Sequence, residues 1–290
     1  MKNKLINVAD FSPEELRKWQ MKLLDILVYF RDFCEKHNLK FYLAAGTCLG
    51  AVRHNGFIPW DDDLDVQMSR NDYEKLIEIW NKEADTNRFV CSVTTKEQSS
   101  RFPMATIRSV NTTCIYNHSV NDDICQGLKI DVEFLDGVPD KKIPLVINFV
   151  CARLLALLRA QRIPERKSTR LKIASKVLLC LFPTPSLRWK VSKICENRIK
   201  KYPFDGCKYV RYLSCAIRPR ECFNDVKYVD FEGYKMPIPI GYDAMLRAAY
   251  GDYMQLPPID KRKPATANLV FYDLDHSYLD YKGVYYCIRN

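Results

Sequence analysis

The sequence predicts an α/β protein interrupted by a helical insertion, and three observations support this class. Over the first 140 residues, segments with helical spacing of apolar residues alternate with short runs of β-branched and aromatic residues. Between residues 141 and about 201 the pattern becomes helical and strongly basic, and strand patterns return beyond it. We therefore expect a core domain over 1–140, a basic helical insertion over 141–205, and a part over 206–290 that completes the core domain.

The first helix is expected to begin after Ser12 and to end near His37. Ser12 can cap it, Pro13 suits the first helical position, and Glu15 stands at the distance of a capping box. Its apolar residues recur with helical spacing, which predicts one buried face. We assign this helix to the core and give it no catalytic role.

A short strand over 40–44 is expected to lead through a turn at Gly46-Thr47 into a short helix. Such a turn lets backbone amides approach an anion closely, and the N-terminus of a helix favours negative charge. Gly46 and Thr47 are therefore candidate phosphate-binding residues. Arg53 and His54, at the end of the short helix, are residue types that bind phosphate, although a surface or supporting role is equally open.

Four aspartates follow within five residues, at positions 61–63 and 65. Carboxylates this close repel one another unless positive charge lies between them. The alternation of acidic and apolar residues from Asp63 onward has the period of a strand, which predicts that Asp63 and Asp65 share one face, about 6–7 Å apart. A divalent cation would relieve the repulsion, and hard oxygen ligands favour Mg²⁺ or Mn²⁺ over Zn²⁺.

The remaining elements follow the same rules of spacing and capping. Ser69 can cap a helix from Arg70 to about Trp80. Prolines at 164 and at 183 and 185 divide the insertion into two or three helices. Further strands are expected over 89–93, 105–110, 128–134, 209–213 and 234–238, and a further helix over 242–250.

A carboxylate from a neighbouring strand would complete a metal site. The segment 129–134 alternates like a strand and places Asp131 and Glu133 on one face. We choose Asp131 as the third metal ligand and keep Glu133 as the reserve. Asp61 is a secondary candidate, and either Asp61 or Asp131 could accept a proton from a hydroxyl.

Composition limits the partners and the compartment. The net charge of +10 favours anionic partners without choosing among nucleotides, phosphoglycans, anionic lipid and nucleic acid. Twelve cysteines without a regular framework predict reduced thiols and a cytoplasmic location, and their spacing offers no structural zinc site. We expect no export signal, and we expect the longest apolar stretch, 143–158, to be too short to span a membrane.

The insertion itself combines apolar faces with dense positive charge, which is typical of helices that lie in a membrane interface. A peripheral contact with the anionic inner face of the cell membrane is therefore one expectation. An ordinary helical subdomain with a solvated basic face is the other, and the sequence favours neither.

Three blocks of the sequence resemble the LicD family, which includes fukutin and fukutin-related protein. The resemblance covers about residues 35–140 and 230–265 and leaves the insertion, where we expect the acceptor to be chosen, outside any motif. The blocks are FYLAAGTCLGAVRHNGFIPWDDDLDV (41–66) with SRNDYEKL (69–76), IDVEFLDGVP (130–139), and FEGYKMPIP (231–239) with YGDYM (250–254), Pro257-Pro258 and Lys261-Arg262.

The resemblance implies a nucleotidyltransferase-like mixed sheet flanked by helices. It also implies a metal-dependent phosphotransferase that moves a phospho-alcohol, phosphocholine in the expected case, from a CDP-linked donor to a hydroxyl. The acceptor would be a cell-surface glycan precursor of the lipopolysaccharide, teichoic acid or glycolipid kind. Asp63 and Asp65 match the family's Asp-x-Asp, Asp131 matches the later aspartate, and Gly46 with Thr47 matches the glycine turn.

Two other functions are weighed against this one. A nucleotidyltransferase with the same metal site would use a nucleoside triphosphate and release pyrophosphate instead of CMP. A noncatalytic protein of the same fold would bind an acidic glycan or nucleic acid, usually with the metal carboxylates lost. All three carboxylates are present and the basic residues lack interleaved aromatic residues, so we favour the enzyme and expect no nucleic acid partner.

Overall fold

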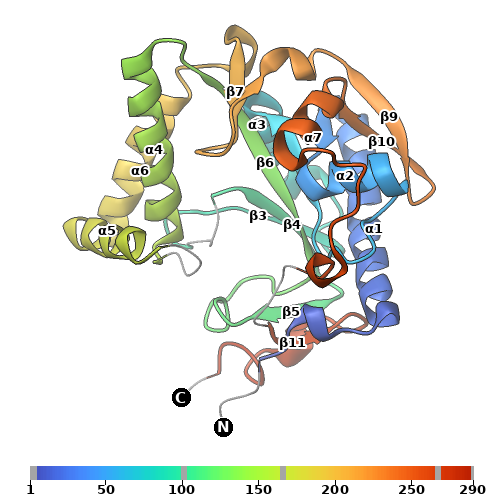
Figure 1. Cartoon of the computed structure of the whole chain (residues 1–290). Coiled ribbons are helices and arrows are strands. Elements are labelled where there is room, and N and C mark those ends of the chain that lie inside the picture. The colour runs from blue at the N-terminus through green and yellow to red at the C-terminus, as the bar shows by residue number, and fades with distance from the viewer. Residues whose placement is uncertain (1–4, 99–102, 164–167, 265–268, 289–290) are drawn as a thin grey trace. The chain divides into compact units, whose positions relative to one another are not determined.

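A computed structural model of the chain describes residues 5–98, 103–163, 168–264 and 269–288 (Figure 1). Contacts divide the chain into two compact units, each assembled from segments that are distant in the sequence. The first unit comprises Met1–Ser92, Thr106–Glu133 and Cys222–Asn290. The second unit comprises Val93–Ala105 and Phe134–Glu221, and contains the whole of the expected insertion.

The elements confirm an α/β protein with a mixed sheet, flanking helices and a helical insertion. Within the first unit lie the following elements, of which β4 and β6 each extend by sequence into the second unit: α1 (Pro13–Lys36), β1 (Phe41–Leu43), α2 (Ala45–His54), β2 (Asp65–Ser69), α3 (Arg70–Glu83), β3 (Phe89–Ser92), β4 (Ala105–Ser109), β5 (Thr113–Tyr116), β6 (Lys129–Val138), β9 (Val226–Phe231), β10 (Tyr234–Pro239), α7 (Tyr242–Tyr250) and β11 (Leu269–Asp273). The second unit holds α4 (Lys142–Ala160), α5 (Thr169–Leu181), α6 (Pro185–Ile199), β7 (Tyr209–Arg211) and β8 (Arg218–Pro219).

The sheet of the first unit has the strand order β1-β2-β6-β4-β3. Strands β1 and β2 are antiparallel, with Leu43 opposite Val66, and β3 and β4 are also antiparallel. Strand β6 lies beside β2, and the Asp131 amide donates to the Leu64 carbonyl at 2.9 Å. The topology therefore brings Asp131 next to the acidic segment that leads into β2.

Helix α1 begins with the expected capping box and packs its buried face on β1 and α3. The Ser12 hydroxyl accepts from the Glu15 amide, and the Glu15 carboxylate accepts from the Ser12 amide. Phe30 lies edge-on to Phe41 of β1 and stacks with Trp80 of α3. These large apolar side chains are almost fully buried, so α1 belongs to the core as predicted.

Two expectations about local structure are wrong. Helix α2 begins at Ala45, so Gly46 and Thr47 lie in its first turn and not in a turn ahead of it. Strand β2 begins at Asp65, so Asp63 precedes the strand and shares no regular strand face with Asp65. The carbonyls of the preceding residues accept hydrogen bonds from side chains of α1, which explains why the segment 61–64 adopts no strand geometry. The sequence also predicts no strand at the positions of β5, β9 and β11.

The hairpin β9–β10 ties the C-terminal part of the first unit to α1. It turns at Glu232 and Gly233, whose φ angles of +53° and +84° suit a two-residue hairpin turn. The Glu232 carboxylate accepts from the Phe57 amide at 3.0 Å and from Arg17 at 2.9 and 2.5 Å. A Cβ at Gly56 would lie 2.3 Å from Glu232 Oε1, so any larger residue there would displace the Glu232 carboxylate from this position.

Replacing Glu232 by Ala is expected to lower the free energy of unfolding by about 2 kcal/mol, because the buried Phe57 amide would lose its acceptor. Arg17→Gln is the matched control, since it removes the ion pair and leaves the amide bond. The Arg17 side chain is half exposed, so this variant should cost less than about 1 kcal/mol. Urea unfolding measures both, and equal losses would show that the ion pair dominates.

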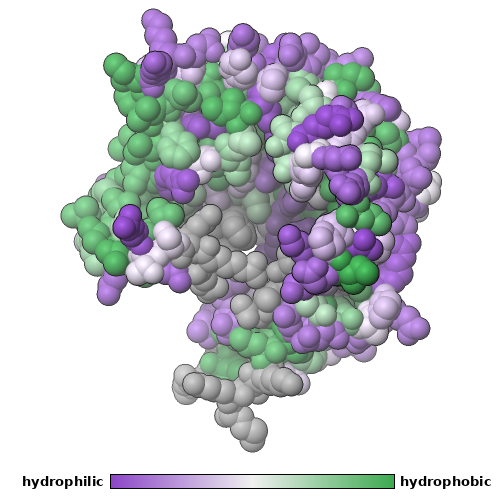
Figure 2. Space-filling view, viewed as in Figure 1, coloured by the Kyte–Doolittle hydropathy of each residue, from purple (hydrophilic) through white to green (hydrophobic). Residues whose placement is uncertain are grey.

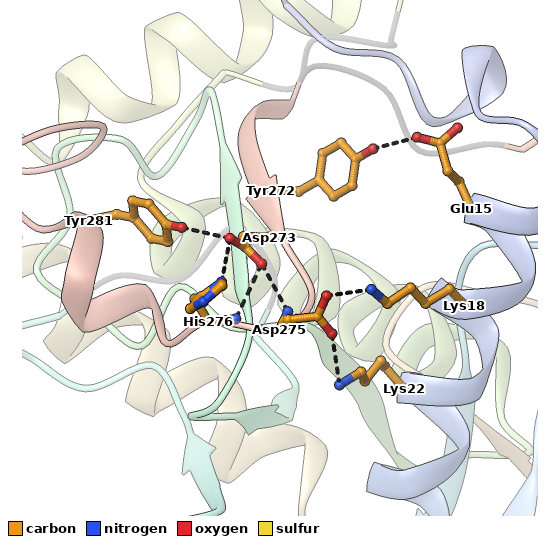
Figure 3. Close-up of polar contacts among 8 residues, drawn as sticks. All are labelled: Glu15, Lys18, Lys22, Tyr272, Asp273, Asp275, His276 and Tyr281. Atoms are coloured by element: carbon orange, nitrogen blue, oxygen red, sulfur yellow. Dashed lines mark hydrogen bonds and ion pairs between the residues drawn. The ribbon is translucent and has the colours of Figure 1, made fainter.

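Strand β11 and the segment after it are anchored on α1 by polar side chains (Figure 3). The Tyr272 hydroxyl donates to Glu15 Oε1 at 3.0 Å. Lys18 and Lys22, one turn apart on α1, both pair with Asp275. Residues near both ends of the chain are thereby held together within the first unit.

In the second unit, α4 and α6 run side by side (Figure 1). Arg159 of α4 pairs with Glu196 of α6 at 2.8 Å, and both side chains are buried. The described residues of the insertion form three helices, where two or three were expected. The break at Pro183 falls between α5 and α6, whereas Pro164 lies outside the described residues.

Helix α4 is longer than the sequence argument allowed. It covers 19 residues and is long and apolar enough, by length and composition alone, to cross a membrane. The expectation that this stretch is too short to span is therefore wrong. Pro144 does not interrupt the helix, because it stands in the first turn, where no intrahelical N–H bond is lost.

Candidate functional site

Four aspartates of the first unit form what we call the carboxylate cluster: Asp61, Asp63, Asp65 and Asp131. Desolvation and repulsion by Asp63 and Asp62 raise the pKa of Asp61 to about 8. Desolvation and repulsion by Asp62 and Asp131 raise the pKa of Asp63 to about 6, although Asp63 is the most exposed of the four. Burial, followed by repulsion from the Asp63 and Asp131 carboxylates, raises the pKa of Asp65 well above its ordinary value. The cluster therefore carries more negative charge than its surroundings compensate.

The residues at the start of α2 hold two members of this cluster in place. Thr47 is buried, and its hydroxyl oxygen accepts from the Asp65 amide at 2.9 Å. The Asp65 carbonyl accepts from the Ala44 amide at 2.9 Å. Gly46 lies against Asp61, since a Cβ there would come within 2.8 Å of Asp61 Oδ2. The strand-to-helix junction thus positions Asp61 and Asp65.

Two residues of α1 fix the backbone between these aspartates. Trp19 Nε1 donates to the Asp62 carbonyl at 2.8 Å, and Gln20 Nε2 donates to the Asp61 carbonyl at 2.9 Å. Gln20 is only 3% exposed. Sequence reasoning gave this helix no part in the site, although a glutamine on an otherwise apolar buried face was a signal that could have been used.

Lys129 is a second residue that sequence reasoning missed. It pairs with Asp131 two residues further along β6, and both side chains are mostly buried. Its charge lowers the pKa values of Asp63 and Asp65, whereas the neighbouring carboxylates raise them. Glu133, two residues beyond Asp131, raises the pKa of Asp65, so its charge acts on the same cluster. The period of two along β6 was the signal that places Lys129 beside Asp131.

The chemistry of this donor set fits a hard divalent cation. Several carboxylates lie close together and repel one another, and the charge of Lys129 offsets part of this repulsion at Asp63 and Asp65 by lowering their pKa values. Oxygen ligands of this kind suit Mg²⁺ or Mn²⁺. Within the described residues, however, no three His, Cys, Asp or Glu side chains already form a ready-made ligand group. The side chains suit a divalent cation by their ligand type and their charge. In this structure Asp131 is paired with Lys129.

A second group of side chains, which we call the basic cluster, adjoins Asp61 through Trp60. It consists of Arg53, His54, Trp60 and Arg262. Arg53 donates to His54 Nε2 at 2.9 Å and to the Tyr253 carbonyl at 2.8 Å. The Arg262 guanidinium lies over the Trp60 ring, 5.5 Å from its centroid, and the His54 ring meets the Trp60 ring edge-on.

Among the described residues, no carboxylate pairs with the positive charge of the basic cluster. Neither Arg53 nor Arg262 has an ion-pair partner in the part of the chain that the structure describes. Desolvation and the nearby Arg262 charge lower the pKa of Arg53, and desolvation and Arg53 lower the pKa of His54. Arg262 was absent from the sequence-based candidates because its contact with Trp60 spans two hundred residues.

The chain is similar in sequence to known proteins. Residues 38–127 match the family described as "LicD/FKTN/FKRP, nucleotidyltransferase domain". The chain is 32% identical over 269 residues to the lipopolysaccharide cholinephosphotransferase LicD of Haemophilus influenzae, which covers 86% of this chain and 95% of that protein. An uncharacterized protein of Rickettsia prowazekii is 39% identical over 74 residues, or 23% of this chain and 28% of its own length.

The protein contains a nucleotidyltransferase domain, as the family match, the fold and the carboxylate cluster together indicate. The chain belongs to the LicD family. The matched segment contains Asp61, Asp63 and Asp65 and ends shortly before Asp131. Asp131, which we expect from the sequence to complete the site, therefore lies outside that matched segment.

Proposed function

We propose that the chain is a metal-dependent phosphotransferase that moves phosphocholine from CDP-choline to a hydroxyl of a lipopolysaccharide or related glycan precursor. The observation that carries the proposal is the crowding of mutually repelling aspartates, together with two nearby arginines that form no ion pair within the described residues. The name of the Haemophilus influenzae relative supports the transferred group and the acceptor. The twelve free thiols are consistent with the reducing cytoplasm.

The donor would be held by the basic cluster and by α2. Arg53 and Arg262 offer guanidinium groups that suit phosphate oxygens, and Trp60 offers an aromatic face on which a base can stack. The first turn of α2 adds free backbone amides, since no side chain caps this helix. His54 accepts a hydrogen bond from Arg53 at Nε2, so it orients that guanidinium as a neutral imidazole.

The carboxylate cluster would hold the cation and the acceptor. Asp63, Asp65 and Asp131 are the proposed metal ligands, and the bound ion would neutralise charge on the diphosphate as CMP leaves. Asp61 would take the proton of the acceptor hydroxyl. We prefer it to Asp131 because Asp131 is paired with Lys129, whereas desolvation favours a proton on Asp61 and raises its pKa to about 8.

Product analysis tests this function. Purified protein with Mg²⁺, CDP-choline and a lipopolysaccharide acceptor is expected to release CMP and to add the mass of phosphocholine to the glycan. CDP-ethanolamine, CDP-glycerol and CDP-ribitol serve as competing donors. Release of pyrophosphate from a nucleoside triphosphate would instead establish a nucleotidyltransferase. Binding of the acceptor without turnover of any donor would establish the noncatalytic alternative.

A further inference from the structure

The helices α4 and α5 of the second unit expose an apolar surface. On α4, Ile143, Val146, Ile147 and Val150 follow one another at spacings of three and four residues, so they form one stripe along the helix. Ile143 is 76% exposed and Val146 is 61% exposed. Figure 2 shows apolar residues gathered over the region that Figure 1 labels α4 and α5.

Helix α5 is almost entirely unpacked within its own unit. Ser175 is its one buried residue, whereas Ile173, Val177 and Leu181 are each more than half exposed. These three residues stand four apart and form a second apolar stripe. Lys172 and Lys176 stand one position before Ile173 and Val177, so a basic stripe runs beside the apolar one. An amphipathic helix of this kind needs another surface to cover its apolar face.

The charge of the insertion indicates what kind of surface could cover these apolar faces. Between residues 141 and 201 there are sixteen Lys and Arg and two acidic residues, a surplus of 14 that exceeds the +10 of the whole chain. The rest of the chain is therefore net acidic. Glu196, the one acidic residue of this segment that the structure describes, is buried against Arg159 and Lys193. A covering surface must therefore be apolar in its interior and anionic at its face.

The opposite side of α4 argues against its insertion across a bilayer. Arg159 is buried in its pair with Glu196, and Asn148 is buried in a hydrogen bond with Arg211 of β7. A spanning α4 would have to break both contacts and place these polar groups in hydrocarbon. The exposed stripe can instead enter the interface while the packed face stays in the protein.

We infer that the exposed faces of α4 and α5 dock the protein onto an anionic lipid bilayer, with the two apolar stripes in the interfacial region and the basic residues on the headgroups. This inference concerns the second unit alone and does not rest on the proposed catalytic function. Such docking would hold the protein at the membrane surface, where a lipid-linked acceptor also lies.

Co-sedimentation of the full chain with vesicles tests this docking. Vesicles of phosphatidylglycerol mixed with phosphatidylcholine are expected to pellet the protein, and vesicles of phosphatidylcholine alone are not. Raising the salt from about 0.1 M to about 0.5 M should weaken binding, because it shortens the Debye length. Resistance to salt with release only by detergent would indicate that α4 spans the bilayer and would overturn an interfacial contact.

Three double variants separate the contribution of the basic residues of α5, the contribution of its apolar residues, and the effect of the net charge of the whole protein. Lys172→Glu with Lys176→Glu is expected to reduce partitioning by about 25-fold or more, since each basic residue near an anionic surface contributes about fivefold. Ile173→Ser with Val177→Ser changes no charge and should also abolish pelleting. Lys36→Glu with Lys40→Glu, both exposed residues of the first unit, makes the same change in net charge and should leave pelleting intact.

Each contrary outcome overturns the docking proposal. Equal recovery in the supernatant with and without phosphatidylglycerol would exclude a lipid contact. An equal loss in the first-unit control would show that only net charge matters. A dimer in sedimentation velocity that Ile173→Ser with Val177→Ser converts to monomer would show that a second copy covers these faces instead. The substituted residues of α5 are exposed, so unchanged melting curves are expected for its variants.

Discussion

Asp65→Asn and Asp63→Asn are each expected to lower kcat/KM for phosphocholine transfer by roughly 10³-fold, about 4 kcal/mol of transition-state stabilisation. The reason is that an amide contributes no negative charge to a site proposed to hold a divalent cation. Initial rates with CDP-choline measure the effect on catalysis. Calorimetric titration with Mg²⁺ should show weakened binding in both variants, which separates loss of the cation from loss of the donor.

The fold is expected to survive these substitutions. Burial and neighbouring carboxylates raise the pKa of Asp65 in the folded protein, so at neutral pH the ionised side chain opposes folding. Asparagine removes that charge, and the Asp65 amide keeps its bond to Thr47. Asp230→Asn, an exposed carboxylate of β9, is the matched control and should keep full activity. Asn variants of the cluster with activity within a few-fold of wild type would contradict the metal site.

Local sequence signals predicted the elements that depend on neighbouring residues. The capping serines at positions 12 and 69 gave the starts of α1 and α3, and the helix expected over 242–250 has those bounds in the structure. The acidic run and the alternation of 129–134 predicted carboxylates on adjacent strands. The topology places Asp65 on β2, beside the strand β6 that carries Asp131 and Glu133, whereas Asp63 precedes β2. In each case the cause lies within a few residues of its effect.

Contacts between distant residues could not be predicted in this way. Strand β5 pairs with β11, which lies more than 150 residues further along the chain, and neither segment has a strong pattern alone. Gln20, Lys129 and Arg262 join the site only because the fold brings α1, β6 and the C-terminal segment to the acidic loop. The position of Asp63 ahead of β2 has the same origin, since α1 side chains bind the carbonyls that a strand would have used.

Asp131→Asn is expected to reduce activity by roughly 10³-fold, whereas Glu133→Gln should reduce it by less than about tenfold. Both residues lie on one face of β6, but their electrostatic reach differs. The charge of Asp131 raises the pKa values of both Asp63 and Asp65, and in raising the pKa of Asp65 it has a larger effect than the charge of Glu133. The Asp131 amide is also bonded to the Leu64 carbonyl, directly ahead of Asp65. We therefore propose Asp131 as the carboxylate that shares a cation with Asp63 and Asp65.

The comparison between these two variants decides the third ligand. Each substitution removes one charge and keeps the size of the side chain, so differences in packing do not confound the rates. Mg²⁺ titration should show weaker binding for Asp131→Asn and near wild-type binding for Glu133→Gln. Equal losses would mean that both carboxylates contact the cation, and a loss confined to Glu133→Gln would move the third ligand two residues along β6. In that case the pair of Lys129 with Asp131 would be structural, because Asp131 would then need no exchange of partner to admit the ion.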